Sequence, residues 1–284
     1  MRHLVRAATP VLLFVMFSSA LAQQPDAGSS SQTGNALRSN DEDALLARAA
    51  KLYYSTKSAG LTGFDCAVHP DWSKLFQGTE SQINTAGSRE SVNLLKSVAI
   101  RLHARMNGGS TLEWVQPSNA SRPLDQASAE TVDQMHKAIE ETLTGFMQFW
   151  TPFVDGSVVP PNAKGIDIRH SPSGLILLLK QPDATVMEVF SNELVLKEFK
   201  VITGGRMIDL KPSYDSVDDG LLLSRFVAHI GPEKDSTKEA QEMDAEIYYQ
   251  TVGNFPIPSR LNVEVVGTGT FDFRLDGCRV NPAD

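Results

Sequence analysis

The sequence lacks the short motifs that mark the commonest catalytic and metal-binding sites. It contains no G-x-S-x-G nucleophile turn, no H-E-x-x-H pair, no phosphate-binding P-loop and no C-x-x-C pair. The segment from Asp215 to Gly220 approaches a calcium-binding loop, but Val217 stands at the third ligand position and Phe226 at the twelfth, where a glutamate is required. We therefore predict no catalytic residue, no resident metal ion and no cofactor.

Basic charge and long apolar runs are also scarce. Lysine and arginine together number 26, against 34 aspartates and glutamates, which gives a formal net charge of −8. A surface that binds nucleic acid or anionic lipid needs a basic excess, so neither partner is expected. Beyond the N-terminal segment no apolar run approaches the ~20 residues that span a bilayer. The chain is therefore predicted not to span a membrane.

Residues 1–22 have the three parts of a cleavable secretory signal peptide. Two arginines and a histidine are followed by the apolar run VLLFVMF and by a small-residue A-x-A site that ends at Ala22. Cleavage before Gln23 would change the formal charge from −8 to −10, because the segment has two arginines and no acid. The alternative is a membrane anchor, which the short apolar run disfavours. We predict an exported protein, periplasmic or secreted.

Only two cysteines occur, Cys66 and Cys278, and they lie 212 positions apart. In an exported chain a single pair most simply forms one disulfide. Each cysteine lies in a strand-like segment, one near the start of the domain and one near its end. The bridge is therefore predicted to join the first and last strands of one sheet; the alternative is a pair of buried free thiols.

The chain after the signal peptide begins with a polar segment and a helix. Residues 23–40 are mostly Gln, Ser, Gly, Ala and Asn, which offer little apolar surface to bury, and they are predicted to form a disordered linker. A first amphipathic helix is predicted from the capping residue Asn40 to Gly60. Residues 41–284 are expected to form a single domain.

Most of the remaining chain alternates apolar and polar residues, which is the periodicity of strands. Phe64, Cys66 and Val68 share one side of a first strand. Residues 98–106 alternate in the same way, and the following Asn-Gly-Gly turn and TLEWV segment complete a hairpin in which His103 lies on the polar side. From Gly165 onward nine more segments have strand character: IDIRH, GLILLLK, TVMEVF, LVLKEFKVI, RMIDLKP, GLLLSRFVAHI, AEIYYQTV, SRLNVEVVG and TFDFRLDGCRV.

This count predicts roughly twelve strands in an α+β protein. The strands are closely spaced, which favours an antiparallel meander, and a sheet of this size usually curls into a barrel or part of one. The five histidines beyond the signal peptide lie on five different elements, none at the i, i+4 spacing of a metal pair. We expect them to be surface or turn residues.

Two apolar features could line a ligand cavity. Residues 175–179 are consecutive leucines and isoleucine, so both faces of that strand are apolar, and Ile176 and Leu178 share one face. The best helix of the chain runs from Ser128 to Trp150 and is expected to end before Pro152. Its apolar face contains Met135, Ile139, Leu143, Phe146 and Trp150. We predict that these seven residues line an apolar cavity; the alternative is that they are ordinary core.

The order of elements is similar to that of a known family. The chain resembles the LolA/LolB-like superfamily of periplasmic lipoprotein carriers. The resemblance lies in the order of a signal peptide, a helix leading into a first strand, a hairpin, a central helix and a run of antiparallel strands. It also lies in the segments DLKPSYDSVDDGLLL and IYYQTVGNFPIPSRL. The resemblance covers most of residues 41–281. It implies a large curved antiparallel sheet, an incomplete barrel whose concave side is covered by helices and holds acyl chains. The arginine with which the carriers close their lid has no matching motif here, so no functional residue is carried over.

We therefore predict a non-enzymatic cell-envelope protein that binds or carries an apolar ligand, such as a lipid or a lipoprotein acyl chain. Burial of acyl surface at ~0.8 kcal/mol per methylene needs no catalytic group. The first alternative is an envelope interaction or scaffold protein with a filled core, whose partner is another envelope protein. The second is an exported hydrolase with a dispersed site.

Overall fold

The computed structural model describes residues 33–75, 86–106, 109–115, 126–155, 158–233, 240–267 and 269–281. The predicted signal peptide and the first part of the predicted linker lie outside the described residues. The described chain divides into two compact units. Unit 1 consists of Ala59–Thr151 and Ile247–Asp284, and unit 2 contains the segment up to Ser58 together with Pro152–Glu246.

Twelve strands form one open antiparallel sheet, which confirms the predicted α+β class and strand number. Their order is β3-β2-β1-β12-β11-β10-β9-β8-β7-β6-β5-β4, so only β1 and β12 are neighbours that are distant in sequence. The strands are β1 (Gly63–Pro70), β2 (Ala99–Arg105), β3 (Ser110–Val115), β4 (Ile166–Ser171), β5 (Gly174–Lys180), β6 (Ala184–Ser191), β7 (Leu196–Thr203), β8 (Arg206–Val217), β9 (Gly220–Pro232), β10 (Gln241–Val252), β11 (Phe255–Val265) and β12 (Gly269–Val280). The incomplete-barrel curvature and the helical cover of a concave side stay predictions.

Five helices lie in the described part of the chain, and none of them is both long enough and apolar enough to cross a membrane. They are α2 (Thr33–Ala50), α3 (Thr56–Ala59), α4 (Trp72–Leu75), α6 (Ala86–Ser97) and α7 (Gln126–Val154). The predicted start of the first helix at Asn40 is wrong, because α2 begins at Thr33, inside the predicted linker. Ala36, Leu37 and Arg38 are strong helix formers, and they allow the helix to extend through Asn40.

The predicted end of the long helix before Pro152 is also wrong, because α7 continues to Val154. Proline in a helix costs about 3 kcal/mol by removing one hydrogen bond and crowding the preceding turn. The last turn is held from outside the helix, because Thr56 donates its hydroxyl to the carbonyl of Val154 at 3.0 Å and Phe153 is buried. These contacts offset the cost of the proline.

Unit 1 contains β1 to β3, β11, β12, the second half of β10 and most of α7. The predicted hairpin is confirmed, since β2 and β3 pair in register from Ala99 with Val115 to Ala104 with Ser110. Helix α7 packs against these strands through aromatic rings. Trp150 meets Phe64 edge to face at 6.1 Å between centroids, and it donates its indole N–H to the hydroxyl of Tyr249 at 2.9 Å.

A bulge in β12 allows the predicted disulfide to form. Asp65 pairs with Arg279 and Ala67 pairs with Asp276, so two steps along β1 correspond to three along β12. Gly277 lies in the bulge with φ of 57°, a conformation that glycine adopts without strain. Cys66 and Cys278 then lie with Cα atoms 4.2 Å apart and are bonded, which confirms the predicted bridge between the first and last strands.

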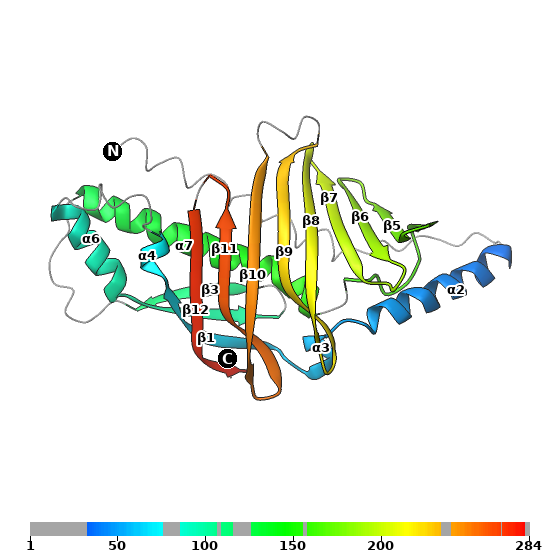
Figure 1. The fold of residues 1–284 in the computed structure, drawn as a ribbon, viewed down its shortest axis with the longest axis horizontal. Coiled ribbons are helices and arrows are strands. Elements are labelled where there is room, and N and C mark those ends of the chain that lie inside the picture. Colours follow the sequence, from blue (N-terminus) through cyan, green and yellow to red (C-terminus); the bar gives the residue numbers. More distant parts are fainter. Residues whose placement is uncertain are drawn as a thin grey trace. The chain divides into compact units, whose positions relative to one another are not determined.

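Unit 2 contains β4 to β9, the first half of β10, the end of α7, and α2 with the segment that follows it. Figure 1 shows β5 to β9 side by side in chain order. Leu177, Glu188, Phe199 and Leu210 are directly opposite one another on β5, β6, β7 and β8. Opposed side chains point to the same side of a sheet, so these four define what we call the inner face of unit 2. The other side is its outer face.

Candidate functional site

The segment of residues 52–57 follows α2 and is fixed to the start of β9, directly after the turn from β8. The amide of Leu221 donates to the carbonyl of Leu52 at 2.7 Å, and the amide of Tyr54 donates to the carbonyl of Leu221 at 3.0 Å. These bonds make a short parallel bridge between Tyr53 and Leu221. Backbone groups of this segment are used in strand-like hydrogen bonds and cannot also form helical ones. The helix predicted to reach Gly60 is therefore interrupted here.

The other end of this segment is fixed to the end of α7. The Ser55 hydroxyl and the Lys57 amide both donate to the carbonyl of Asp155, at 3.0 and 3.2 Å. Thr56 is fully buried and also donates to Val154. Because both ends are bonded to other elements, the two tyrosines between them are held in defined positions.

Tyr53 is bonded to the turn between β6 and β7. Its hydroxyl accepts a hydrogen bond from the amide of Leu196 at 2.7 Å and lies 3.3 Å from the carbonyl of Leu194, to which it donates. Leu194 has a φ of 64°, which is unusual for a residue other than glycine and is held here by its burial and by this contact. Both hydrogen-bonding functions of the Tyr53 hydroxyl are therefore in use.

Glu188 lies on the inner face of unit 2 in an apolar setting. Its cross-strand neighbours are Leu177 and Phe199, and its neighbours along β6 on the same side are Val186 and Phe190. All four are buried, and Glu188 itself is only 6% exposed. Its Oε2 atom is buried with no hydrogen-bond partner among the described residues.

Three further buried oxygens in unit 2 lack a hydrogen-bond partner among the described residues. One is Oδ1 of Asp209, whose other oxygen lies 3.3 Å from the ammonium group of Lys200 on the outer face. The other two belong to tyrosines. They are the hydroxyl groups of Tyr214, on β8, and of Tyr54. The ring of Tyr214 meets that of Tyr53 edge to face, with 5.3 Å between centroids. Tyr53 and Tyr214 are near enough to Glu188 for its charge to affect their ionisation.

Burial makes the protonated form the favoured form of each of these groups. It raises the pKa of Glu188 to about 8, and no lysine or arginine of the described segments opposes this effect. Burial also raises the pKa of Tyr53 to about 12, against the hydrogen bond from Leu196, and raises that of Tyr214 well above its ordinary value. Near neutral pH the inner face therefore has a carboxylic acid and phenols, all uncharged.

The other two buried acids of the described chain are paired with cations. Asp272 accepts two hydrogen bonds from Arg260, at 2.9 and 2.6 Å, and one from Lys74 at 2.6 Å. The Arg260 hydrogen bonds lower the pKa of Asp272 against the opposing effect of burial. Asp65 lies 3.3 Å from Arg105. Glu188 is the exception among the buried acids, and this makes it the candidate functional group.

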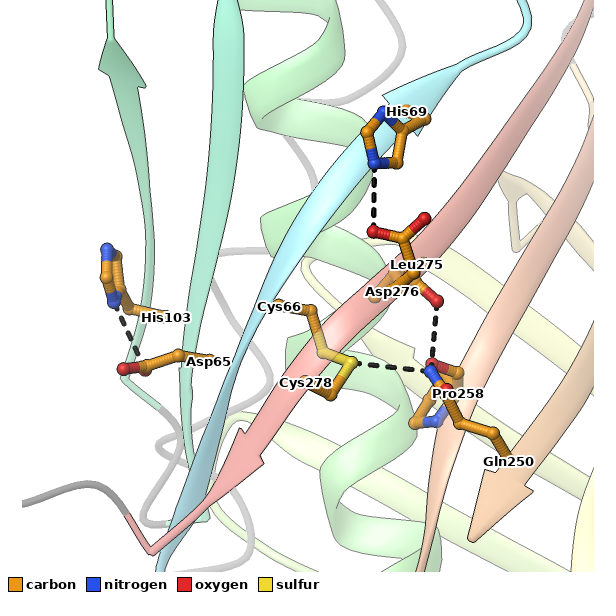
Figure 2. Close-up of a disulfide and its surroundings, with 9 residues drawn as sticks. All are labelled: Asp65, Cys66, His69, His103, Gln250, Pro258, Leu275, Asp276 and Cys278. Carbon is orange, nitrogen blue, oxygen red and sulfur yellow. Dashed lines mark hydrogen bonds and ion pairs between the residues drawn. A yellow bond between two sulfur atoms is a disulfide. The ribbon is translucent and has the colours of Figure 1, made fainter. Parts of the chain in front are cut away.

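The histidine nearest to a catalytic arrangement is fully engaged by carboxylates. His103 lies on the polar side of β2, as predicted, with Nδ1 3.1 Å from Asp65 and Nε2 3.3 Å from Glu113. Figure 2 shows His103 and Asp65 pointing toward each other beside the disulfide. With a carboxylate at each ring nitrogen, His103 has no free nitrogen with which to activate a substrate. The described residues contain no group of three or more His, Cys, Asp or Glu able to hold a metal ion.

The disulfide has a polar neighbour on β10. The side-chain amide of Gln250 donates to the carbonyl of Leu275 at 2.9 Å and lies 3.3 Å from the Sγ atom of Cys278 (Figure 2). His69, on the same strand as Cys66, lies 3.0 Å from Asp276. These bonds fix the bridge between two paired strands, which is a structural arrangement.

The helix residues predicted to line a cavity lie mostly in the core of unit 1. Ile139, Leu143 and Trp150 are fully buried, Phe146 is 5% exposed, and Met135 is half-buried. Trp150 is enclosed by Phe64 and Tyr249. The seven-residue set is not brought together within one unit, because the helix residues belong to unit 1 and Ile176 and Leu178 to unit 2.

Ile176 and Leu178 lie on the outer face of unit 2. Leu175 and Leu177 are buried at 2% exposure, whereas Ile176 and Leu178 are half-buried, so the predicted alternation is confirmed. The cross-strand neighbour of Leu178 is Met187, and beyond it lies the ion pair of Lys200 with Glu198. The predicted cavity pair and Glu188 are therefore on opposite sides of the sheet.

Sequence reasoning missed Glu188, although a signal was present. In the strand TVMEVF it is the only charged residue, and both faces of that strand are otherwise apolar or contain threonine. Strand periodicity places Glu188 on the same side as Val186 and Phe190, so one acid stands in an apolar row. That Glu188 lacks a cation depends on strands β5 and β7, whose register the sequence does not specify.

No protein-family model matches this chain, and neither a curated protein nor a solved structure matches it.

Proposed function

We propose that the protein is an exported cell-envelope protein, periplasmic or secreted, that binds an apolar ligand with a polar end. The apolar part would lie against the inner face of unit 2, and the polar end would reach Glu188 and Tyr214. The observation that carries the proposal is the buried carboxyl of Glu188 on a mostly apolar sheet face, with its Oε2 atom lacking a hydrogen-bond partner among the described residues.

The energetic reasoning behind this proposal is that such groups lower stability. A buried polar atom left without a partner costs about 1–3 kcal/mol, against a typical total stability of about 5–15 kcal/mol. Tyr214 adds a second such atom on β8. A leucine at position 188 would avoid the cost, so the acid is best explained by a partner that it meets during function.

The role of a lipid or lipoprotein carrier, as in the LolA/LolB-like superfamily, is the specific form of this proposal. It is supported by the disulfide, which is typical of exported proteins, and by the twelve-stranded antiparallel sheet. A non-enzymatic role is supported by the engagement of both ring nitrogens of His103.

A second candidate is an envelope scaffold protein with a filled core that binds another envelope protein. It is favoured by the complete burial of Ile139, Leu143 and Trp150, because side chains without exposed surface are typical of a packed core. The proposed ligand site is assigned to unit 2 because that unit contains Glu188, not because its inner face is more exposed: Leu177 and Phe190 are buried there to the same extent.

The test combines native mass spectrometry with probe binding. Protein purified from the envelope of its own host is expected to carry a bound mass that organic solvent extracts. The refolded, delipidated protein is expected to bind a fluorescent fatty alcohol, and Leu177→Phe, which fills the inner face beside Glu188, is expected to weaken that binding.

The matched control is the double variant Ile176→Asp with Leu178→Asp, which changes only the outer face. It is expected to bind the probe as the parent does. If the double variant loses binding while Leu177→Phe keeps it, the ligand lies against Ile176 and Leu178 on the outer face, the pair predicted from the sequence to line the cavity. A parent protein that carries no mass and binds no probe would leave the scaffold role as the better proposal.

A further inference from the structure

We propose that the polar end of the ligand is an ammonium group, which pairs with the Glu188 carboxylate and lies against the rings of Tyr53, Tyr214 and Phe199. This inference rests on the proposed function of unit 2 and names the class of its ligand. The ligand is an amphiphile that has one or more apolar chains and a cationic amine.

The first argument is the identity of the unpartnered group. Glu188 is the only buried acid of the described chain without a cation, whereas Asp65 and Asp272 each have an arginine within 3.3 Å. Without a positive charge beside it a buried acid stays protonated, and a neighbouring cation is what allows it to ionise. Since the described chain provides no cation at Glu188, the complementary ligand is one that brings its own.

The second argument is the aromatic setting. Phe199 is the direct cross-strand neighbour of Glu188, and Phe153 meets Phe199 edge to face at 5.9 Å between centroids. Tyr53 and Tyr214 form a second edge-to-face pair nearby. Aromatic faces attract ammonium groups, and a carboxylate beside aromatic rings is the combination that recognises amines. The hydroxyl of Tyr214 is available to accept a hydrogen bond from the ammonium.

An anionic head group fits this site poorly. A carboxylate or phosphate buried at Glu188 would bring a negative charge into an apolar site where the described residues provide no cation to pair with it. A neutral alcohol could hydrogen-bond to the protonated acid but would gain nothing from charge. The expected order of affinity is therefore ammonium, then alcohol, then carboxylate.

Binding of an ammonium should release a proton from the protein. Glu188 is protonated in the free protein at pH 6.5, while an alkylamine is already an ammonium ion at that pH. Formation of the pair breaks the O–H bond of Glu188, leaves the carboxylate beside the ammonium and transfers that proton to the buffer. Tyr53 and Tyr214, the titratable groups facing Glu188, stay protonated because their pKa values are raised.

The test uses decylammonium, decanol and decanoate at concentrations below their aggregation thresholds, with isothermal titration calorimetry at pH 6.5. Decylammonium is expected to bind the parent protein at least about tenfold more tightly than decanol. The heat of decylammonium binding is measured in buffers of different ionisation enthalpy. Its dependence on the buffer is expected to show that about one proton is released for each amine bound.

Two variants make the assignment specific. Glu188→Gln is expected to abolish both the preference for the amine and the proton release while keeping decanol affinity. Glu198→Gln removes an acid from the outer face with the same change of net charge and is expected to behave as the parent does. Equal binding of amine and alcohol by the parent, or amine binding without proton release, would overturn the inference and leave the proposed function in place. Failure of the parent to bind any of the three would overturn both.

Discussion

Glu188 makes its own contribution to the pH dependence of folding stability. Below pH 4.5, its ordinary pKa, it is protonated in both the folded and the unfolded chain. Between pH 4.5 and about 8 the unfolded chain ionises while the folded protein holds the proton, so the folded state loses stability as the pH rises. Above about pH 8 both states are ionised and this loss stops growing.

The first prediction at this scale is a pH-dependent effect of Glu188→Gln. The parent is expected to lose roughly 5 kcal/mol of stability from this residue between pH 4.5 and 8, a loss that the amide variant avoids. The variant should therefore be the more stable protein at pH 8 and gain little at pH 4.5, as measured by urea unfolding at both values. Glu198→Gln, on the outer face, is the control. Parallel pH profiles for parent and Glu188→Gln would show that Glu188 is not held in its protonated form.

At the scale of elements, the turn between β8 and β9 positions the tyrosines. Gly220 has a φ of 132°, and a Cβ atom there would lie 2.9 Å from the carbonyl oxygen of Leu52 and from backbone atoms of Tyr53 and Tyr54. The segment of residues 52–57 and this turn are therefore in backbone contact that only glycine permits. The Asp-Asp-Gly sequence that fails as a calcium loop thus has a structural role.

We expect Gly220→Ala to destabilise the protein more than Gly267→Ala does. Both glycines have positive φ, but a Cβ at Gly267 would meet nothing within 4 Å, so that variant bears backbone strain alone, about 1–2 kcal/mol. Gly220→Ala must also displace the 52–57 segment, and faster amide exchange at Tyr54 and Leu221 should accompany the lower melting temperature. Similar melting temperatures and unchanged exchange would contradict the contact.

At the scale of the whole molecule, the disulfide connects the first and last strands of the sheet. Cys66 and Cys278 close a loop of 212 residues between adjacent strands β1 and β12. Closing so long a loop removes many conformations from the unfolded chain, which on the chain-entropy model stabilises the fold by roughly 5 kcal/mol.

Replacing both cysteines by alanine should therefore lower the free energy of unfolding by up to about 5 kcal/mol. Chemical unfolding with and without a reductant measures this effect. The reductant should shift the parent toward the midpoint of the double variant and leave the variant unchanged. An identical midpoint for parent and variant, with or without reductant, would mean that the bridge contributes nothing to stability.

The alternation of residues predicted most of the strands. It located both strands of the hairpin, the opposite directions of Leu177 and Leu178 and the polar side of His103, because alternation is a local property of the backbone. Local sequence signals failed to predict where two helices end, because contacts with distant residues determine those ends. Thr56 supports the helix beyond Pro152, and the pairing of Tyr53 with Leu221 interrupts the first predicted helix.

The sequence by itself determined the α+β class, the twelve strands and the pairing of the two cysteines, because these follow from local periodicity and from there being only two partners. Only the tertiary structure decided which buried acids have cations. Asp272 meets Lys74 and Arg260 across 198 and 12 positions, whereas Glu188 meets Leu177 and Phe199. The register of neighbouring strands sets these encounters, and a shift of one residue would turn every side chain to the other face. The candidate site is therefore a product of register, which no single segment of the chain encodes.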